Sequence, residues 1–465
     1  MTFIRLPWLC LVIFFLVTTA RAEHGADSDP VTVAAHDVMF AGAEQADKAL
    51  SFMRQRGNLD VVPGLILSLQ YNRRSDEPIL ETLRALTGYE AHTWHLWMLW
   101  LEAHPKVRPH AGYEDLMMRT LRHIDPVMGL IFRNRRGKKS SMRVRLEEIV
   151  WGGVGAMSGI PSLDNPHMLK AAEADYLADD DLVFGVRIKD DARAYPLRIM
   201  GWHEMFNDTI GGVPVALAYC TLCGSEILYE TLLKGRVALP GRGKPLVFGS
   251  SGLLYRSNKL MFDWETLSLW NQFTGRPVAG PLARSNIRLK TRPVAITTWA
   301  EWRQGNPNTT VLSLETGYAR DYGSSVVYND YFNSPNLMFP AVVKANSPLQ
   351  PKAYVFGIRA FRTARAWPLA AFTKTPIIND RMGKRNLVLI GNPATRTVRA
   401  YDRGSKSFTQ GPAGAIMGWG GVWQLTEAAL LGPNGEKLRR VPGHIAYWFA
   451  WENYVGAKAS LYEER

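Results

Sequence analysis

The sequence contains very little cysteine, with three residues among 465. Cys10 lies in the first apolar segment, so the rest of the chain holds only Cys220 and Cys223. A framework of disulfides needs several cysteine pairs, which excludes the class of small secreted domains that disulfides hold together. The remaining two cysteines therefore form either a special site or a pair without a role.

Long hydrophobic runs are also scarce. At the N-terminus, Arg5 precedes an apolar run from Leu9 to Val17, and Ala20-Arg21-Ala22 fits the small-residue rule for cleavage. The run is shorter than the roughly 20 residues that a membrane-spanning helix needs. We therefore expect a signal peptide over residues 1–22, cleaved after Ala22, and a periplasmic or secreted mature protein.

Acidic residues are fewer than basic ones, 42 against 55, which gives a formal net charge of +13. The basic residues are spread along the chain apart from a cluster between Arg133 and Lys139. An exported protein rarely meets nucleic acid, so we expect no nucleic-acid partner. A basic surface instead favours a peripheral contact with an anionic membrane or the cell wall.

The chain divides into regions that differ in composition and in the spacing of their apolar residues. Residues 23–35 are small and polar and are expected to form a flexible leader. Over residues 36–132, apolar residues recur at helical spacing between glycines and prolines, which predicts a helical domain that could dock a protein partner. A basic linker, residues 133–159, follows. Short runs rich in Val, Ile, Tyr and Phe then predict a β-rich domain over residues 160–465.

The expected fold class is therefore α+β, with an N-terminal α-helical repeat or bundle domain followed by a larger, mainly β domain. One helix should interrupt the β domain. Thr298 and Glu301 have the spacing of a capping box ahead of Trp302, and Gly305 and Pro307 should end that helix.

Candidate metal ligands gather between Gly201 and Cys223. Cys220 and Cys223 are two residues apart at the end of an apolar run, and such a turn brings two thiolates to one metal ion. His203 lies upstream and Met261 downstream, and both could complete the ligand set. We expect the metal site to consist of Cys220, Cys223, His203 and Met261, oriented by Glu204, Asn207 and Asp263.

A thioether beside two thiolates and an imidazole suits copper better than zinc. Zinc becomes the alternative cofactor if Glu204 or Asp263 takes the place of Met261. The first hypothesis is therefore an exported, copper-binding redox protein, which as an enzyme would be a metal-dependent oxidoreductase.

Two other functions fit the same cysteines. In a thiol-disulfide oxidoreductase, Cys220 would attack and Cys223 would resolve the mixed disulfide. The β-rich sequence on both sides is unlike the thioredoxin setting, where CxxC opens a helix. In a non-catalytic binding or structural protein, the pair would hold zinc or form a small-loop disulfide.

The other polar clusters are weaker candidates for a functional site. His92 and His95 lie three residues apart on one predicted helix face, but the neighbouring tryptophans favour packing over metal binding. His444 is a reserve ligand. The run from Asp179 to Asp181 lacks the spacing of a calcium loop, and Gly249 to Gly252 does not make the GxSxG elbow of serine hydrolases.

Several long motifs match a known family. The box YCTLCG has Thr221 where proline is usual, HE..ND covers His203 to Asp208, and SGLLY.SN..M.D covers Ser251 to Asp263. From about Ile160 to Tyr462 the chain closely resembles the bacterial family called domain of unknown function 3179. The resemblance implies no activity, because none is attached to that family. It also leaves the helical region outside the family.

Overall fold

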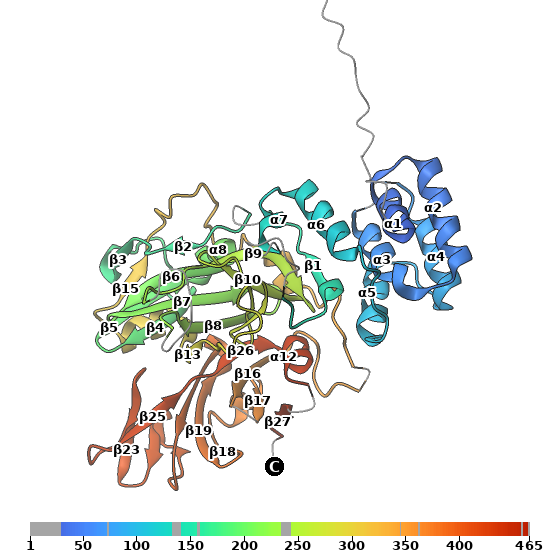
Figure 1. Ribbon diagram of the computed structural model, residues 1–465. Helices are drawn as coiled ribbons and strands as arrows, with labels where there is room; N and C mark the ends of the chain where they lie inside the picture. Colours follow the sequence, from blue (N-terminus) through green and yellow to red (C-terminus); the bar gives the residue numbers. More distant parts are fainter. Residues whose placement is uncertain are drawn as a thin grey trace, which may run out of the picture.

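The computed structural model describes residues 29–71, 74–132, 141–155, 159–233, 243–344, 346–360, 363–456 and 459–463. Figure 1 shows a helical N-terminal part beside a central β body, with a further large sheet from the C-terminal part of the chain below it. The predicted α+β class is confirmed. The predicted signal peptide lies outside the described residues. No described helix has the length and the apolar character that crossing a membrane requires.

The helical part contains seven α-helices among the described residues. They are α1 (Pro30–Phe40), α2 (Ala43–Arg56), α3 (Val62–Tyr71), α4 (Glu77–Thr87), α5 (Trp94–Ala103), α6 (Tyr113–Ile124) and α7 (Met128–Ile131). The predicted helical spacing is confirmed on α4, where Ile79, Leu80 and Leu83 are buried. These side chains belong to one hydrophobic cluster that continues into the β body and includes Cys220.

The expected leader over residues 23–35 is too long, because α1 begins at Pro30. The Asp29 carboxylate accepts a hydrogen bond from the backbone N–H of Thr32, which caps the helix, and proline suits the first helical turn. Val31 and Ala34 are buried against the other helices. The small residues that resembled a leader therefore form a packed helix.

The β body is built from three five-stranded sheets. Across the first lie β1 (Ile149–Trp151), β9 (Phe248–Tyr255), β10 (Asn258–Asp263), β11 (Leu269–Asn271) and β12 (Arg276–Ala279). Across the second lie β13 (Lys290–Arg292), β8 (Ser225–Glu230), β7 (Val213–Cys220), β6 (Met205–Ile210) and β2 (Leu163–Asp164). Across the third lie β14 (Ala295–Thr298), β4 (Leu182–Ile188), β5 (Asp191–Pro196), β15 (Thr310–Leu312) and β3 (Met168–Lys170).

Two more sheets come from the C-terminal part of the chain. Across one lie β26 (His444–Tyr447), β16 (Tyr354–Arg359), β17 (Ala364–Pro368) and β27 (Ala459–Leu461). Across the other, named here the C-terminal sheet, lie β18 (Ile377–Met382), β19 (Arg385–Asn392), β20 (Thr397–Asp402), β25 (Lys437–Val441), β24 (Ala429–Leu431), β23 (Gly421–Leu425), β22 (Ile416–Gly418) and β21 (Thr409–Gln410). The helices between strands are α8 (Leu197–His203), α9 (Trp299–Gly305), α10 (Asn329–Asn333), α11 (Ala371–Lys374) and α12 (Trp448–Val455).

The expected linker over residues 133–159 is shorter than predicted. β1 pairs with β9 in antiparallel register, with Ile149 opposite Tyr255, so this segment is part of the first sheet. Just before it, Arg145 donates to Glu148 at 2.9 Å and to the carbonyl oxygen of Leu101 at 3.0 Å. These contacts join the end of α5 to the sheet. Residues 133–140 and 156–158 lie outside the described part.

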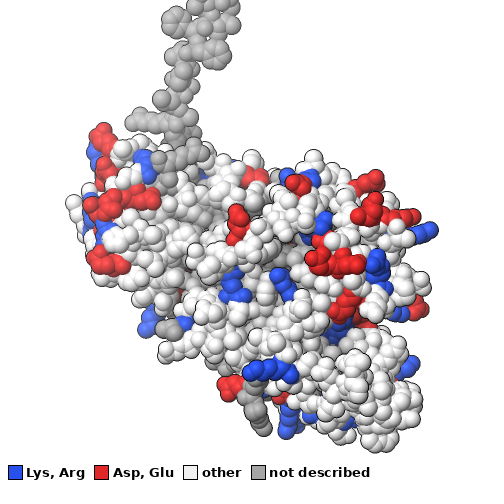
Figure 2. All heavy atoms as spheres, turned by 180° about the vertical axis from the view of Figure 1, so that it is seen from behind, with Lys and Arg blue, Asp and Glu red and all other residues white. Residues whose placement is uncertain are grey.

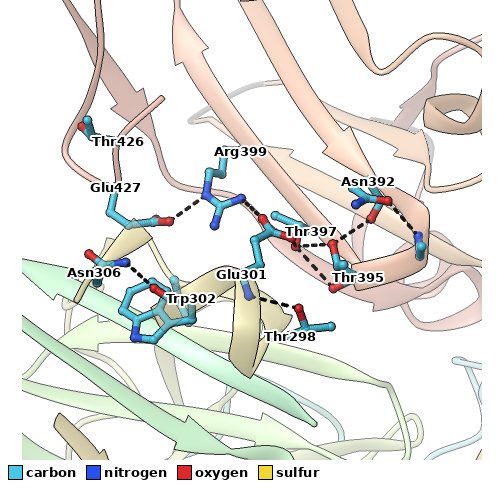
Figure 3. Close-up of polar contacts among 12 residues, drawn as sticks. Thr298, Glu301, Trp302, Asn306, Asn392, Thr395, Thr397, Arg399, Thr426 and Glu427 are labelled. Atoms are coloured by element: carbon cyan, nitrogen blue, oxygen red, sulfur yellow. Dashed lines mark hydrogen bonds and ion pairs between the residues drawn. The ribbon is translucent and has the colours of Figure 1, made fainter. Parts of the chain in front are cut away.

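The C-terminal sheet is fixed to the β body through α9, as Figure 3 shows. Arg399 on β20 bonds Glu301 on α9 at 3.0 Å and Glu427 at 2.7 Å. The Thr298 hydroxyl accepts from the backbone N–H of Glu301 at 3.3 Å, which confirms the predicted start of this helix. The capping signal in the sequence therefore also positions a carboxylate at the boundary.

Positive charge is concentrated in the C-terminal sheet more than the composition of the whole chain suggests. Residues 377–441 contain ten Lys and Arg but four Asp and Glu. On the face drawn in Figure 2, acidic side chains gather over the upper part, while the lower right lobe shows mainly uncharged and basic side chains.

Candidate functional site

The two cysteines lie in the tight turn that joins β7 to β8. Cys220 ends β7, and the backbone N–H of Cys223 donates to the Cys220 carbonyl at 3.2 Å. Gly224 follows with φ +54°, and a Cβ there would lie 3.1 Å from the Tyr447 ring, so the turn requires glycine. The thiols are free, and their residues are 1% and 0% exposed. The sequence spacing thus places two buried thiols in one turn.

The two thiols differ in acidity. Burial raises the pKa of Cys220, but the hydrogen bond from Cys223, the backbone N–H of Lys259 and the Lys259 charge outweigh it, so that pKa is lowered overall. Burial and the neighbouring Cys220 sulfur hold the pKa of Cys223 well above its usual value. Cys220 is therefore the more acidic of the two thiols.

A buried ion pair stands next to Cys220. Lys259 Nζ lies 3.1 Å from Glu204 Oε2, and these side chains are 3% and 6% exposed. The other oxygen of Glu204 accepts from the Thr221 hydroxyl at 2.8 Å, inside the cysteine turn. Burial lowers the pKa of Lys259, and the charges of Glu204 and Cys220 oppose that shift. Lys259 and Glu204 therefore neutralise each other next to Cys220.

Two side-chain amides, those of Asn258 and Gln272, are hydrogen-bonded in series next to Cys223. The side-chain amide of Asn258 donates to Cys223 Sγ at 3.4 Å and to Gln272 Oε1 at 2.7 Å. Gln272 in turn donates to the carbonyl oxygens of Ala218 at 2.8 Å and Ser225 at 3.1 Å. Because these carbonyls flank the turn on β7 and β8, the amides hold Cys223 at a fixed place relative to both strands.

Tyrosines from distant segments cover the turn. Tyr331 on α10 donates its hydroxyl to the Leu222 carbonyl at 2.6 Å, and the backbone N–H of Tyr447 donates to the Cys223 carbonyl at 2.8 Å. Burial raises the pKa values of Tyr331 and Tyr454, and the charge of Cys223 raises them further, which places both rings near the sulfur. The site is therefore closed by the 313–353 segment and by the region around α12.

His203, the first expected ligand besides the cysteines, is engaged elsewhere. It ends α8, is fully buried, and bonds the Pro161 carbonyl at 2.8 Å through Nδ1 and the Tyr322 hydroxyl at 2.6 Å through Nε2. Burial lowers the pKa of this imidazole. Both ring nitrogens are therefore occupied: Nε2 joins α8 to Tyr322, and Nδ1 joins it to Pro161.

Met261, the other expected ligand, lies on β10 opposite Trp270. It packs with Met205 and Phe248 in a hydrophobic cluster separate from the one that contains the cysteines. Within the described residues, no group of three or more His, Cys, Asp or Glu side chains is arranged to hold a metal ion. The structure thus brings the two cysteines together with Glu204, but not with His203 or Met261.

The remaining expected supporting residues stabilise the strands. Asn207 on β6 donates to Asp164 at 2.7 Å and exchanges hydrogen bonds with the backbone of Phe248, which joins two sheets. Asp263 accepts from the Thr266 hydroxyl and from the Trp270 indole, both at 2.8 Å. Burial raises the pKa of Asp263, and these bonds oppose the shift. Neither residue contacts a cysteine in these bonds.

The weaker candidates have local partners. His92 lies 3.4 Å from an Arg84 nitrogen, and His95 lies 3.4 Å from the Met338 carbonyl. Asp181 pairs with Arg198 at 2.6 Å. His444 Nδ1 lies 3.0 Å from the Ile445 carbonyl.

Sequence reasoning missed Lys259 and Asn258, which contact the ion pair and the second sulfur. A signal was present, because a lysine between an asparagine and the apolar run LMF is unusual in a strand that must be buried. Such a lysine needs a buried partner. The partner, Glu204, is 55 residues away in the chain, so the sequence alone did not identify it.

The comparisons with known proteins give a family but no activity. No curated protein and no solved structure matches the chain. The family model described as "Protein of unknown function (DUF3179)" matches residues 157–458, which cover the β body from β2 onward, the C-terminal sheet and α12. This range contains Cys220, Cys223, Lys259 and Glu204 and excludes α1 to α7. The chain therefore belongs to the DUF3179 family, as its motifs had indicated.

Proposed function

We propose that the protein is a redox protein whose active group is the Cys220–Cys223 dithiol, which exchanges with a disulfide substrate. The observation that carries this proposal is the hydrogen bond between two buried, free thiols of opposite pKa shift. A lower pKa on one thiol and a proton held on the other are the properties of an attacking and a resolving cysteine.

The balance of charge supports a dithiol and disulfide couple. Burying an unpaired charge is costly, and Lys259 already neutralises Glu204. The dithiol and the disulfide are both neutral overall, so the couple changes oxidation state without leaving a net charge in the interior. The small turn and Gly224 keep the two sulfurs close in both states.

The reaction follows from the positions of the protons. The Cys220 thiolate attacks one sulfur of the substrate, which forms a mixed disulfide and releases the first substrate thiolate. That thiolate takes up the proton of Cys223. The Cys223 sulfur then attacks the Cys220 sulfur, which closes the Cys220–Cys223 disulfide and releases the second substrate sulfur, protonated from solvent. Two electrons pass from the protein to the substrate, and the reverse sequence oxidises a dithiol substrate.

A redox titration tests this proposal. The purified protein is equilibrated in thiol buffers of defined potential, and its free thiols are counted after acid quenching. We expect one reversible two-electron transition between about −270 and −120 mV, the range of known exchange proteins. The variants Cys220→Ser and Cys223→Ser should lose it. A dithiol that never oxidises, or a disulfide reduced only below about −300 mV, would rule out exchange.

Copper binding by the same two cysteines is a second candidate. It is favoured by the donors at both sulfurs, the Lys259 N–H at Cys220 and the Asn258 amide at Cys223, because such bonds stabilise thiolate ligands. Two thiolates suit Cu(I), but the complex would carry one net negative charge beside the neutral ion pair. Elemental analysis after purification without chelators tests this candidate. One equivalent of copper that both serine variants lose would support it, and metal-free protein would exclude it.

A further inference from the structure

A cavity of about 440 Å³ is lined by the segment around α10, whose Tyr331 bonds the Leu222 carbonyl in the cysteine turn. It lies where α8, the 323–333 part of the segment around α10, and the turn before β20 meet. Its volume is in the range of small-molecule sites, which often lie where separate parts of a fold come together. The dithiol itself is buried, so a substrate needs such a cavity close to Cys220.

Two arginines, Arg198 and Arg396, line the cavity and supply positive charge and hydrogen-bond donors. Arg198 pairs with Asp181, but its Nε is buried and has no hydrogen-bond partner. Arg396 stacks on the Tyr354 ring, 4.5 Å from its centroid, and in the part of the chain that the structure describes no carboxylate pairs with it. Asp180 also lines the cavity, on its exposed side. Unused guanidinium donors favour a ligand that carries a carboxylate or a similar anion.

The segment that lines the cavity also contacts the cysteine turn. Val327 and Asn329 line the cavity, whereas Tyr328, between them, turns the other way. The Tyr328 side chain bonds Thr221, and the charges of Glu204 and Cys220 act on it. Tyr328 therefore links the segment that lines the cavity to the cysteine turn.

Contacts between aromatic rings also link Arg396 to the turn that holds Cys223. The Tyr354 ring under Arg396 packs on Tyr447 with a centroid distance of 4.7 Å, and the backbone N–H of Tyr447 donates to the Cys223 carbonyl. A ligand held by Arg396 would thus lie against the side chains that cover both cysteines.

We propose that this cavity binds the substrate of the dithiol, a small disulfide that bears carboxylates, and that Arg396 together with Arg198 selects its negative charge. This inference rests on the proposed dithiol function. The ligand carboxylate bonds the guanidinium groups, and its sulfur reaches Cys220 when Tyr328 turns aside.

Three disulfides of similar size and different charge test the inference: the anionic dithiodiglycolate, the neutral bis(2-hydroxyethyl) disulfide and the cationic cystamine. Rates of oxidation of the reduced full-length protein are compared for the wild type, Arg396→Gln and Arg381→Gln. Arg381 is an exposed arginine on β18 that bonds the Gly383 carbonyl, so its variant removes the same charge away from the cavity.

We expect dithiodiglycolate to react about tenfold faster than the neutral disulfide, since one charged hydrogen bond is worth about that factor. Cystamine should react slowest. Arg396→Gln should remove the preference, and Arg381→Gln should keep it. Equal rates for the three reagents in the wild type, or an unchanged preference in Arg396→Gln, would overturn the assignment of this cavity.

A binding measurement separates this inference from the dithiol function. Calorimetry with dithiodiglycolate on the double variant Cys220→Ser, Cys223→Ser detects the anion site without any exchange. Binding that Arg396→Gln abolishes supports the cavity even if the wild type never oxidises, which would refute only the dithiol function. A reversible redox transition without anion binding would refute the cavity and leave the dithiol function in place.

Discussion

Lys259 Nζ lies 3.1 Å from Glu204 Oε2 and 3.2 Å from the carbonyl oxygen of Tyr219, the residue directly before Cys220. This contact joins β10 to the two segments that hold the predicted site, because Glu204 follows α8 and Tyr219 lies on β7. A charged pair in this position affects both the stability of the fold and the acidity of the thiol.

Lys259→Met should leave Glu204 buried without its cation, which costs about 3–5 kcal/mol in the free energy of unfolding. The pKa of Cys220 should also rise, because the positive charge beside it is lost. Urea unfolding and the thiolate absorbance at 240 nm measure the two effects. The double variant Lys259→Met, Glu204→Gln should recover part of the stability, and a double variant as unstable as the single one would contradict this account.

The hydrogen bond between the thiols can be tested at Cys223. Cys223→Ala removes the donor to Cys220, so the pKa of Cys220 should rise. Cys223→Ser keeps an O–H donor and should shift that pKa less. The pH dependence of thiolate absorbance gives both values. Equal shifts in the two variants would show that the Cys223 side chain does not donate to Cys220.

His444 predicts a dependence of stability on pH. Burial and the charge of Arg359 lower its pKa from 6.5 to about 3, so the folded protein keeps it neutral while the unfolded chain binds a proton below pH 6.5. Its contribution is complete above pH 6.5 and is lost as the pH falls toward 3, at about 1.4 kcal/mol per pH unit.

The comparison that isolates this effect is His444→Gln, measured by urea unfolding between pH 5 and 7, above the range in which most carboxylates titrate. As the pH falls over this interval, the unfolding free energy of the wild type should decrease more than that of the variant. The difference should approach the slope of about 1.4 kcal/mol per pH unit that the uptake of one proton gives. Parallel curves for the two proteins would mean that another group causes the acid sensitivity.

The contacts in Figure 3 predict unequal roles for two glutamates. Glu427 is 6% exposed and bonds Arg399, whereas Glu301 is 32% exposed and bonds the same arginine. Glu427 also bonds Arg440, which the figure does not label. Glu427→Gln should cost about 3–5 kcal/mol, because it leaves the buried Arg440 without its carboxylate and leaves Arg399 with only the partly exposed Glu301. Glu301→Gln is the matched control and should cost about 1 kcal/mol or less. Similar losses of unfolding free energy would contradict this assignment.

The sequence predicted the local parts of the site and missed those that depend on distant packing. Cys220 and Cys223 are brought together by two intervening residues, so their spacing was sufficient. His203 and Glu204 are adjacent, yet they reach different surroundings, since Glu204 ends α8 in the left-handed region with φ +54° and turns the chain into β6. Nothing in the sequence shows that turn.

The same limit applies to the fold. The change from helical to strand-like periodicity predicted the α+β class, because each periodicity is visible within a few turns or residues. The first helix was missed because Val31, Ala34 and Ala35 give weak local signals and become buried only against other helices. Likewise, the pairing of β1 with β9 joins residues about one hundred positions apart, so the segment resembled a linker.

The position of α12 affects how the site is assembled during synthesis. Tyr447, which bonds the cysteine turn, and Tyr454 on α12 follow Cys223 by more than 220 residues in the chain. Cys220 and Cys223 are made far earlier, so the nascent chain exposes both thiols until these later segments have folded over them. An oxidant or a metal donor would therefore meet this pair most easily before Tyr447 and Tyr454 are in place, and the oxidation state of the folded protein would then depend on events during its own production.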